Sequence, residues 1–220
     1  MSKLHVDSIT KSFGDKKILQ DVYLSCETGK VVGLFGSNGV GKSTLFQIIF
    51  GTLKGENQFI KFNTSILQNQ WDRKNKISYL PQYSFLPKNS KIKNLINLFC
   101  NKENSNKLHN LELIQPFLNE IPKNLSSGEQ RIIEVLLIIH SHSDIILLDE
   151  PFHSVSPKIT TELKKIIKEI SKQKGFIISD HNYQDVLDIS DEMYLLSNTH
   201  VRQIKDIKEL QLFKYLPKSI

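Results

Sequence analysis

The sequence predicts an α/β fold in which helices cover both faces of a mainly parallel β-sheet. Two largely apolar runs, Ile145–Leu148 and Phe176–Ser179, are typical of strands that are buried on both faces. The segment between them, Pro157–Ser171, carries apolar residues at helical spacing with lysines on the opposite face. Strands that alternate with helices in this way favour parallel pairing, because the helix forms the crossover connection.

The composition is that of a globular protein. The chain has 220 residues, of which 39% are hydrophobic and 24% are charged, and a chain of this length can bury a sizeable core. The net charge is +6, but the lysines are scattered and no aromatic residues interleave with them as a base-stacking surface requires. We therefore expect a solvated, lysine-rich surface and no nucleic-acid partner.

Membrane and redox signals are weak. The N-terminus lacks the apolar core of a signal peptide, and no apolar run approaches the roughly 20 residues that span a bilayer. Cys26 and Cys100 have no partners at metal-ligand or redox spacing, which predicts reduced thiols in a cytosolic protein. If the protein acts at a membrane, a second chain must supply the spanning part.

The N-terminal region is expected to contain an antiparallel β part. Turns at Gly14-Asp15 and around Gly29 separate the first strands, and residues 45–50 predict the first turns of a helix. Strands are predicted at Leu4–Ile9, Ile18–Ser25, Val31–Phe35, Gln58–Phe62 and Ile77–Leu80.

The character of the chain changes at about residues 87–124. Asparagine and lysine become frequent, and two helices are predicted, Ile92–Cys100 and Lys107–Asn119, with Pro116 able to end the second early. We expect these residues to form a small helical subdomain. It would be inserted into the core formed by residues 1–86 and 125–220, so that residues 1–220 make one domain.

Alternation of strands and helices resumes after this insertion. Ser127–His140 is apolar on most faces, as a buried helix would be. Met193–Leu196 is predicted to be a further core strand. Residues after Thr199 are expected to add only a short strand and a helix.

A glycine-rich sequence follows the strand Val31–Phe35 and precedes the first helix. It allows backbone N–H groups to approach phosphate oxygens, and the helix N-terminus adds partial positive charge. Lys42 can reach the β- and γ-phosphates, and the Ser43 hydroxyl can ligate Mg²⁺. This context favours a nucleoside triphosphate site over a glycine-rich turn that matches by accident. The pattern G-x-x-x-x-G-K-[ST] is matched without exception by Gly36, Ser37, Asn38, Gly39, Val40, Gly41, Lys42 and Ser43, and Thr44 follows it.

Polar residues follow three of the predicted strands. Asp149 can hold Mg²⁺, and Glu150 beside it can polarise an attacking water as a general base. Gln82 can sense Mg²⁺ or that water, and His181 can donate to a γ-phosphate. Without a phosphate-binding loop upstream, a solvated loop would be the better interpretation of Asp149-Glu150, and a structural role would be the usual one for His181. Their interpretation therefore depends on the phosphate-binding loop upstream.

The buried helix opens with the sequence Leu125-Ser126-Ser127-Gly128-Glu129. A Ser-Ser-Gly turn at a helix N-terminus offers free N–H groups and hydroxyls, which predicts a second anion site. The same residues also predict an N-cap, with Ser126 or Ser127 capping and Glu129 in the first turn. The two roles are compatible.

The order of these motifs resembles that of ATP-binding-cassette (ABC) ATPases, over nearly the whole chain. The shared order is phosphate loop, glutamine, Leu-Ser-x-Gly-Glu, strand-Asp-Glu-Pro and strand-Asp-His. The resemblance implies the ATP-binding, ATP-hydrolysing subunit of a transporter, with ATP and Mg²⁺ as cofactors. The implied catalytic residues are Glu150, His181, Gln82 and Lys42, and the implied metal ligands are Ser43, Gln82 and Asp149. The sequences Asp149–Phe152 and Ser179–Asn182 are similar to those of branched-chain amino-acid importer and lipopolysaccharide-export ATPases.

The same resemblance implies partners. Two cassettes, identical or related, would close head to tail, so that Ser126 and Gly128 serve the nucleotide bound to the partner's phosphate loop. Phe13 falls where an aromatic residue stacks on adenine, with an edge-strand core residue as its alternative role. A separate transmembrane permease would hold the chain at the inner face of the cell membrane, on the cytoplasmic side.

Three features depart from the family pattern. Ser156 replaces an aspartate that helps to couple the two sites. Ser127 replaces the glycine that is usual at the third position of the family's signature sequence, Leu-Ser-x-Gly-Glu. Both substitutions bear on the rate and cooperativity of hydrolysis. The segment between Gln82 and Ser126 is short for the helical subdomain, which bears on the groove for the partner. None of the three removes a residue expected to bind ATP.

Three functions are compatible with these motifs. The leading hypothesis is a transport subunit in which MgATP closes the dimer and hydrolysis at Glu150 reopens it. The alternative is a soluble, non-transport ABC ATPase, for example an iron–sulfur assembly factor. A regulatory module with little turnover is the third, and only Ser127 and Ser156 favour it.

Overall fold

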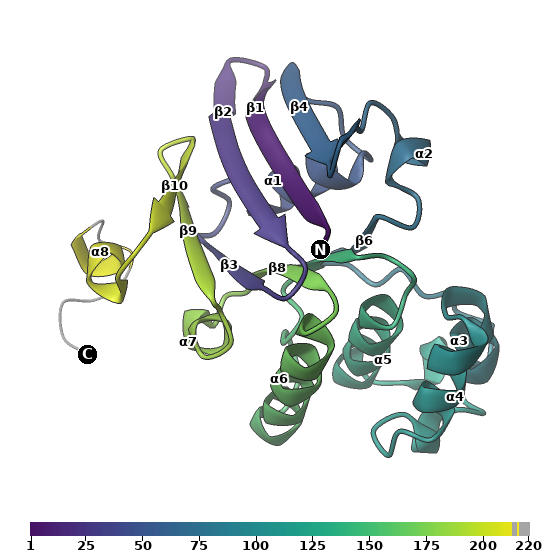
Figure 1. The fold of residues 1–220 in the computed structure, drawn as a ribbon. Coiled ribbons are helices and arrows are strands. Elements are labelled where there is room, and N and C mark those ends of the chain that lie inside the picture. The colour runs from purple at the N-terminus through teal and green to yellow at the C-terminus, as the bar shows by residue number, and fades with distance from the viewer. Residues whose placement is uncertain (213–214, 216–220) are drawn as a thin grey trace.

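Two β-sheets and two layers of helices make up the part of the chain that the computed structural model describes, residues 1–212 and 215 (Figure 1). The strands are β1 (Lys3–Phe13), β2 (Lys16–Glu27), β3 (Val31–Phe35), β4 (Asn57–Phe62), β5 (Ser65–Ile66), β6 (Ile77–Leu80), β7 (Ile145–Asp149), β8 (Gly175–Ser179), β9 (Glu192–Ser197) and β10 (His200–Ile204). The helices are α1 (Lys42–Phe50), α2 (Gln70–Arg73), α3 (Ile92–Phe99), α4 (Lys102–His109), α5 (Ser127–Ile139), α6 (Pro157–Ser171), α7 (Tyr183–Leu187) and α8 (Ile207–Leu212). Two 3₁₀ turns are η1 (Gln115–Phe117) and η2 (Pro122–Asn124).

The larger sheet is mainly parallel. Its six strands lie in the order β10-β9-β3-β8-β7-β6, and only the edge strand β10 pairs antiparallel with its neighbour. The smaller sheet has four strands in the order β2-β1-β4-β5, all paired antiparallel. The predicted fold class, a parallel α/β core with an antiparallel N-terminal part, is confirmed.

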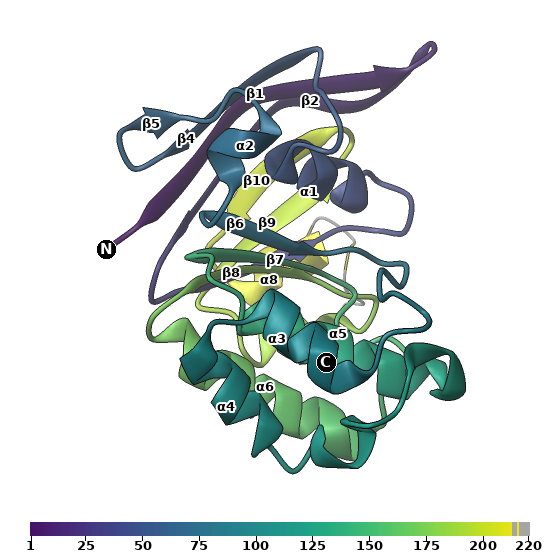
Figure 2. The ribbon, with the colours of Figure 1, turned by 90° about the vertical axis from the view of Figure 1, so that its right-hand side faces the viewer.

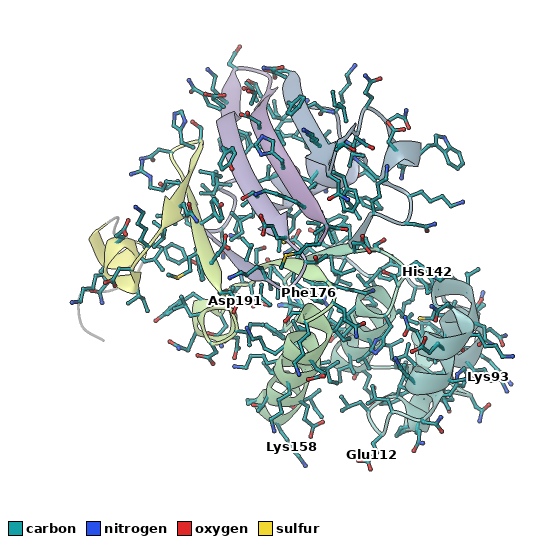
Figure 3. All side chains as sticks on the ribbon, viewed as in Figure 1. Lys93, Glu112, His142, Lys158, Phe176 and Asp191 are labelled. Atoms are coloured by element: carbon teal, nitrogen blue, oxygen red, sulfur yellow. The ribbon has the colours of Figure 1, made fainter. Side chains whose placement is uncertain are left out.

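The larger sheet separates two apolar cores. Figure 2 shows α1 between the two sheets, whereas α3, α4, α5 and α6 cover the opposite face of the larger sheet. Side chains alternate along β7: Ile145 and Leu147 pack toward α1, and Ile146 and Leu148 toward α5. Phe176, at the centre of the sheet in Figure 3, is fully buried. The continuous apolar runs of the sequence follow from burial on both faces.

One predicted helix is wrong in position. The sequence pattern predicts a helix over Lys107–Asn119, but the structure forms α4 over Lys102–His109 and then an irregular segment. The side chain of Asn101 accepts a 2.7 Å hydrogen bond from the backbone N–H of Asn104 and so starts the helix earlier. Pro116 lies in the turn η1, where its ring and missing N–H are compatible with a first turn but not with a helix interior.

Several elements are longer than predicted or were missed. The hairpin of β1 and β2 extends past the apolar pattern to Phe13 and Lys16, and left-handed residues at Ser8 and Asp21 accompany shifts in its register. The short elements β5, α2 and α7 were not predicted, because five or fewer residues carry too little periodicity to detect. The predicted strand and helix after Thr199 are present as β10 and α8.

Among the described residues, no helix is both long enough and apolar enough to cross a bilayer.

Both cysteines are free and buried, and burial raises the pKa of the Cys100 thiol to about 11. These thiols are therefore protonated near neutral pH.

Candidate functional site

The phosphate-binding loop joins β3 to α1 at the carboxyl edge of the parallel sheet. Gly41, the residue before α1, has a φ of +119°, and a Cβ there would lie 2.7 Å from Cγ2 of Ile18. Only glycine fits this combination of conformation and close approach. No side chain caps α1, so the N–H groups of its first turn remain available to an anion.

Lys42 lies over this loop. Its Nζ donates hydrogen bonds to the backbone oxygens of Gly36, at 2.6 Å, and Ser37, at 3.2 Å. Burial lowers the pKa of Lys42, and the carboxylates of Asp149, Glu150 and Asp180 act against that shift. The ammonium of Lys42 is therefore partly desolvated. A phosphate bound beside it would stabilise its positive charge.

Asp149 is a buried carboxylate at the end of β7. It accepts hydrogen bonds from the Tyr79 hydroxyl at 3.2 Å and from the Ser179 hydroxyl at 3.1 Å, and it also interacts with the Ser43 hydroxyl. Burial raises the pKa of Asp149 in spite of these bonds. A buried carboxylate beside a serine hydroxyl offers the oxygen ligands that Mg²⁺ prefers, and the cation would offset the buried charge.

Three residues from the ends of neighbouring strands meet at one carboxylate oxygen. Oε2 of Glu150 accepts a 3.1 Å hydrogen bond from Nε2 of Gln82, and it lies 2.8 Å from Nε2 of His181. Nδ1 of His181 lies 3.0 Å from Oδ1 of Asn38 in the phosphate-binding loop. Because β6, β7 and β8 are adjacent and parallel, the residues that follow them reach the same place.

A cavity of about 430 Å³ contains most of the predicted nucleotide-binding residues. Phe13, at the tip of the β1–β2 hairpin, is 52% exposed and lines the cavity, so it is not a core residue. Gly36, Ser37, Val40 and Asp149 do not line the cavity. The full lining is Phe13, Ile18, Asn38, Gly39, Gly41, Lys42, Ser43, Thr44, Gln82, Glu150 and His181.

The serine-glycine turn before α5 lies at a different cavity. Ser126 forms a capping box, in which its Oγ accepts from the N–H of Glu129 and the Glu129 carboxylate accepts from the N–H of Ser126 at 2.8 Å. A Cβ on Gly128 would lie 2.4 Å from the backbone oxygen of Ser154. Ser126, Gly128 and Ser156 line this second cavity, also of about 430 Å³, whereas none of them lines the one at the phosphate-binding loop.

Sequence reasoning missed Arg131, which is buried in α5. Its guanidinium donates to the backbone oxygens of Pro81, Asp149 and Glu150, and it forms a 3.0 Å ion pair with Glu134. The signal was present, because Arg131 and Glu134 are charged residues that stand among the apolar residues of this helix. Such charges are buried only when they are paired or hydrogen-bonded.

A sequence profile of the ABC transporter family matches residues 19–153, which is more than half of the chain. This span includes the phosphate-binding loop, the Leu-Ser-Ser-Gly-Glu sequence and the Asp149-Glu150 pair. The chain belongs to the ABC transporter family. It is an ATPase of that family and ATP is its nucleotide, as the resemblance implied.

Curated relatives of this ABC ATPase align over most of its length. The lipopolysaccharide export system ATP-binding protein LptB of Haemophilus influenzae is 29% identical over 210 residues, covering 89% of this chain and 87% of LptB. An uncharacterized ABC transporter ATP-binding protein of Methanocaldococcus jannaschii is 27% identical, covering 97% of this chain and 83% of that protein.

Solved structures share the fold of this ABC ATPase. An ATP-binding subunit of an ABC transporter superposes with a TM-score of 0.84 at 20% identity, covering 96% of this chain and 93% of that one. A nucleotide-free ATP-binding cassette superposes with a TM-score of 0.80 at 22% identity, covering 99% and 97%.

Proposed function

We propose that this ABC ATPase is the nucleotide-binding subunit of a transporter, in which two cassettes close head to tail around two MgATP and drive a separate transmembrane subunit. One observation carries the proposal. Ser126 and Gly128 lie at a cavity separate from the phosphate-binding loop of their own chain. A second cassette, placed head to tail, would bring these residues to a nucleotide held by its own loop.

Within one cassette, the loop and Lys42 would bind the phosphates, and Phe13 would stack on the adenine ring. The oxygens of Ser43, Asp149 and Gln82 fit Mg²⁺ and would hold it. When bound, Mg²⁺ would neutralise charge that develops on the phosphate oxygens.

Hydrolysis would depend on the cluster around Glu150. Its carboxylate would orient the attacking water and take its proton, and Gln82 would hold that carboxylate in place. His181, linked to Asn38 of the loop, would donate a hydrogen bond to the γ-phosphate. Lys42 would stabilise the same phosphate by charge.

The transmembrane partner would dock on a groove of about 580 Å³ between α2 and α3. Trp71 of α2 is 81% exposed and Leu98 of α3 is 74% exposed, and both line the groove. A second cavity shares Phe99 with it and reaches Pro81, the residue before Gln82. Movement of the partner would therefore be transmitted through Phe99 and Pro81 to the turn that carries Gln82.

Residues 87–124 would act as the helical subdomain. The complex with the transmembrane partner would place the chain at the cytoplasmic face of the membrane.

The first test is catalytic. Glu150→Gln removes the proposed base but keeps the shape of the side chain, so ATP binding should persist while hydrolysis falls by about 10²- to 10⁴-fold. Equal rates for the variant and the wild type would remove Glu150 from the mechanism.

The second test concerns the partner. The Glu150→Gln protein with ATP, used as bait in detergent-solubilised native membranes, should recover a stoichiometric polytopic membrane protein. Adding Trp71→Ser and Leu98→Ser to the bait should abolish this recovery without reducing ATP binding. Recovery of soluble partners alone would favour the non-transport ATPase, such as an iron–sulfur assembly factor.

A further inference from the structure

Glu150 and His181 have a third neighbour, His153, that the proposed ATPase mechanism does not use. Each of the three residues offers a metal-ligand atom, and these atoms all lie within 4.8 Å of one another. Glu150 is buried at the base of the group, whereas both imidazoles are exposed. Glu150 and His181 also line the cavity at the phosphate-binding loop.

The backbone after β7 brings His153 back over Glu150. Glu150 has a left-handed φ of +56°, and the N–H of His153 donates a 3.2 Å hydrogen bond to the backbone oxygen of Glu150, which closes a tight turn. β8 lies beside β7, so His181 approaches from the neighbouring strand. The rings of His153 and His181 lie 6.1 Å apart between centroids, with an interplanar angle of 70°.

We propose that the nucleotide-free protein binds one Zn²⁺ ion through Glu150, His153 and His181. Two imidazoles and one carboxylate form a donor set that Zn²⁺ accepts, with a fourth position open to water. Ligand atoms around tetrahedral Zn²⁺ lie about 3.3 Å from one another, so the exposed imidazoles need only side-chain rotation to close on the ion. Mg²⁺ prefers six oxygen ligands, which separates this site from the one at Ser43 and Asp149.

Zinc at this site would inhibit the ATPase, an inference that rests on the proposed function. A Glu150 carboxylate bound to Zn²⁺ cannot take a proton from water, and a metal-bound Nε2 of His181 cannot donate to a phosphate. His153 has no proposed role in hydrolysis. Its replacement should therefore remove inhibition by zinc and leave the basal rate unchanged.

Metal binding can be tested without ATP. We would titrate the nucleotide-free wild type with Co²⁺, whose visible absorption strengthens in tetrahedral sites, and then displace it with Zn²⁺. We expect one ion per chain, with affinity at least tenfold weaker in His153→Ala. His142→Ala is the matched control, because His142 is exposed but lies beside α3 in the groove with Leu98 (Figure 3). It should bind as the wild type does. Absence of binding by the wild type, or equal affinity of wild type and His153→Ala, would overturn the proposal.

A second measurement tests the inhibition. Zn²⁺ should inhibit MgATP hydrolysis by the wild type and by His142→Ala at concentrations that leave His153→Ala active. Equal inhibition of all three proteins would overturn the regulatory part of the proposal. If none of them hydrolyses ATP, the proposed function fails, while the Co²⁺ titration still decides the metal site.

Discussion

Nε of Arg131 donates a 3.1 Å hydrogen bond to the backbone oxygen of Glu150. The same guanidinium donates a 2.8 Å bond to the backbone oxygen of Pro81, the residue before Gln82. The helix that the signature sequence opens therefore holds both turns that carry the proposed base and the glutamine beside it. The buried carboxylate of Glu134 balances the charge of Arg131 and accepts from Ser84.

Replacing Arg131 should destabilise the protein. Arg131→Met leaves the Glu134 charge buried without its partner, and breaking such a pair costs about 3–5 kcal/mol of unfolding free energy. The measurement is urea denaturation of the nucleotide-free protein. The matched control is Lys172→Met, which breaks an exposed i,i+3 pair with Glu169 and should change stability by at most about 0.5 kcal/mol. Similar losses in both variants would contradict the role assigned to Arg131.

Asp149→Asn should stabilise the nucleotide-free fold at neutral pH while abolishing Mg²⁺-dependent hydrolysis. Burial raises the pKa of Asp149, so as pH rises the unfolded chain releases this proton before the folded chain does. Above the pKa of the unfolded chain, the ionised carboxylate therefore reduces the stability of the wild type. This reduction disappears below about pH 4, where Asp149 is protonated in both the folded and the unfolded state. Denaturation of both proteins at several pH values measures the difference, which should grow from acid to neutral pH.

Asp188→Asn provides a control of opposite sign. Hydrogen bonds from Lys164 and Gln184 lower the pKa of Asp188, so its ionised form stabilises the fold above the unfolded pKa. Its replacement should weaken the protein slightly at neutral pH and have no effect in acid. If Asp149→Asn followed the same trend as Asp188→Asn, the charge of Asp149 would not be a cost to the fold.

Two inactive variants should restore activity to each other. Lys42→Ala removes the phosphate-binding ammonium, and Gly128→Ala places a Cβ against the backbone of Ser154 in the other cavity. In a head-to-tail dimer of this chain, a mixed pair retains one intact site. Random mixing should recover up to about a quarter of wild-type ATPase activity, because half of the dimers are mixed.

The Gly128→Ala protein should also still bind ATP in isolation, since Gly128 does not line the cavity at the phosphate-binding loop. Equilibrium binding of a fluorescent ATP analogue checks this point. Mixtures that stay inactive would argue against a dimer of this chain with itself.

Phe13 should contribute to nucleotide affinity through its ring. Stacking of a base on an aromatic side chain contributes about 1–3 kcal/mol, so Phe13→Ala should weaken ATP binding about five- to 150-fold, whereas Phe13→Trp should preserve it. Isothermal titration measures both. Tyr23→Ala is the control, because Tyr23 is an exposed aromatic residue of β2 that does not line the cavity. An equal loss in Tyr23→Ala and Phe13→Ala would exclude stacking by Phe13.

Elements with strong local signals were predicted closely. Pro157–Ser171 matches α6 at both ends, because Pro157 suits a first turn and the apolar spacing is regular. Val31–Phe35 likewise matches β3. The helix predicted at Lys107–Asn119 failed because Leu111 and Ile114 pack into the core from an irregular segment. A helical pattern in the sequence does not distinguish that packing from a helix.

By itself, the sequence determined the strand–loop–helix unit at residues 31–50 and the side chains available at the strand ends. Those features depend on neighbours along the chain and on the backbone freedom of glycine. Only the tertiary structure decided which groups meet. Gln82, Glu150 and His181 converge because β6, β7 and β8 are adjacent, and Arg131 reaches two turns because α5 packs beneath them. Sheet order and helix packing arise from long-range burial of apolar surface, which no local pattern encodes.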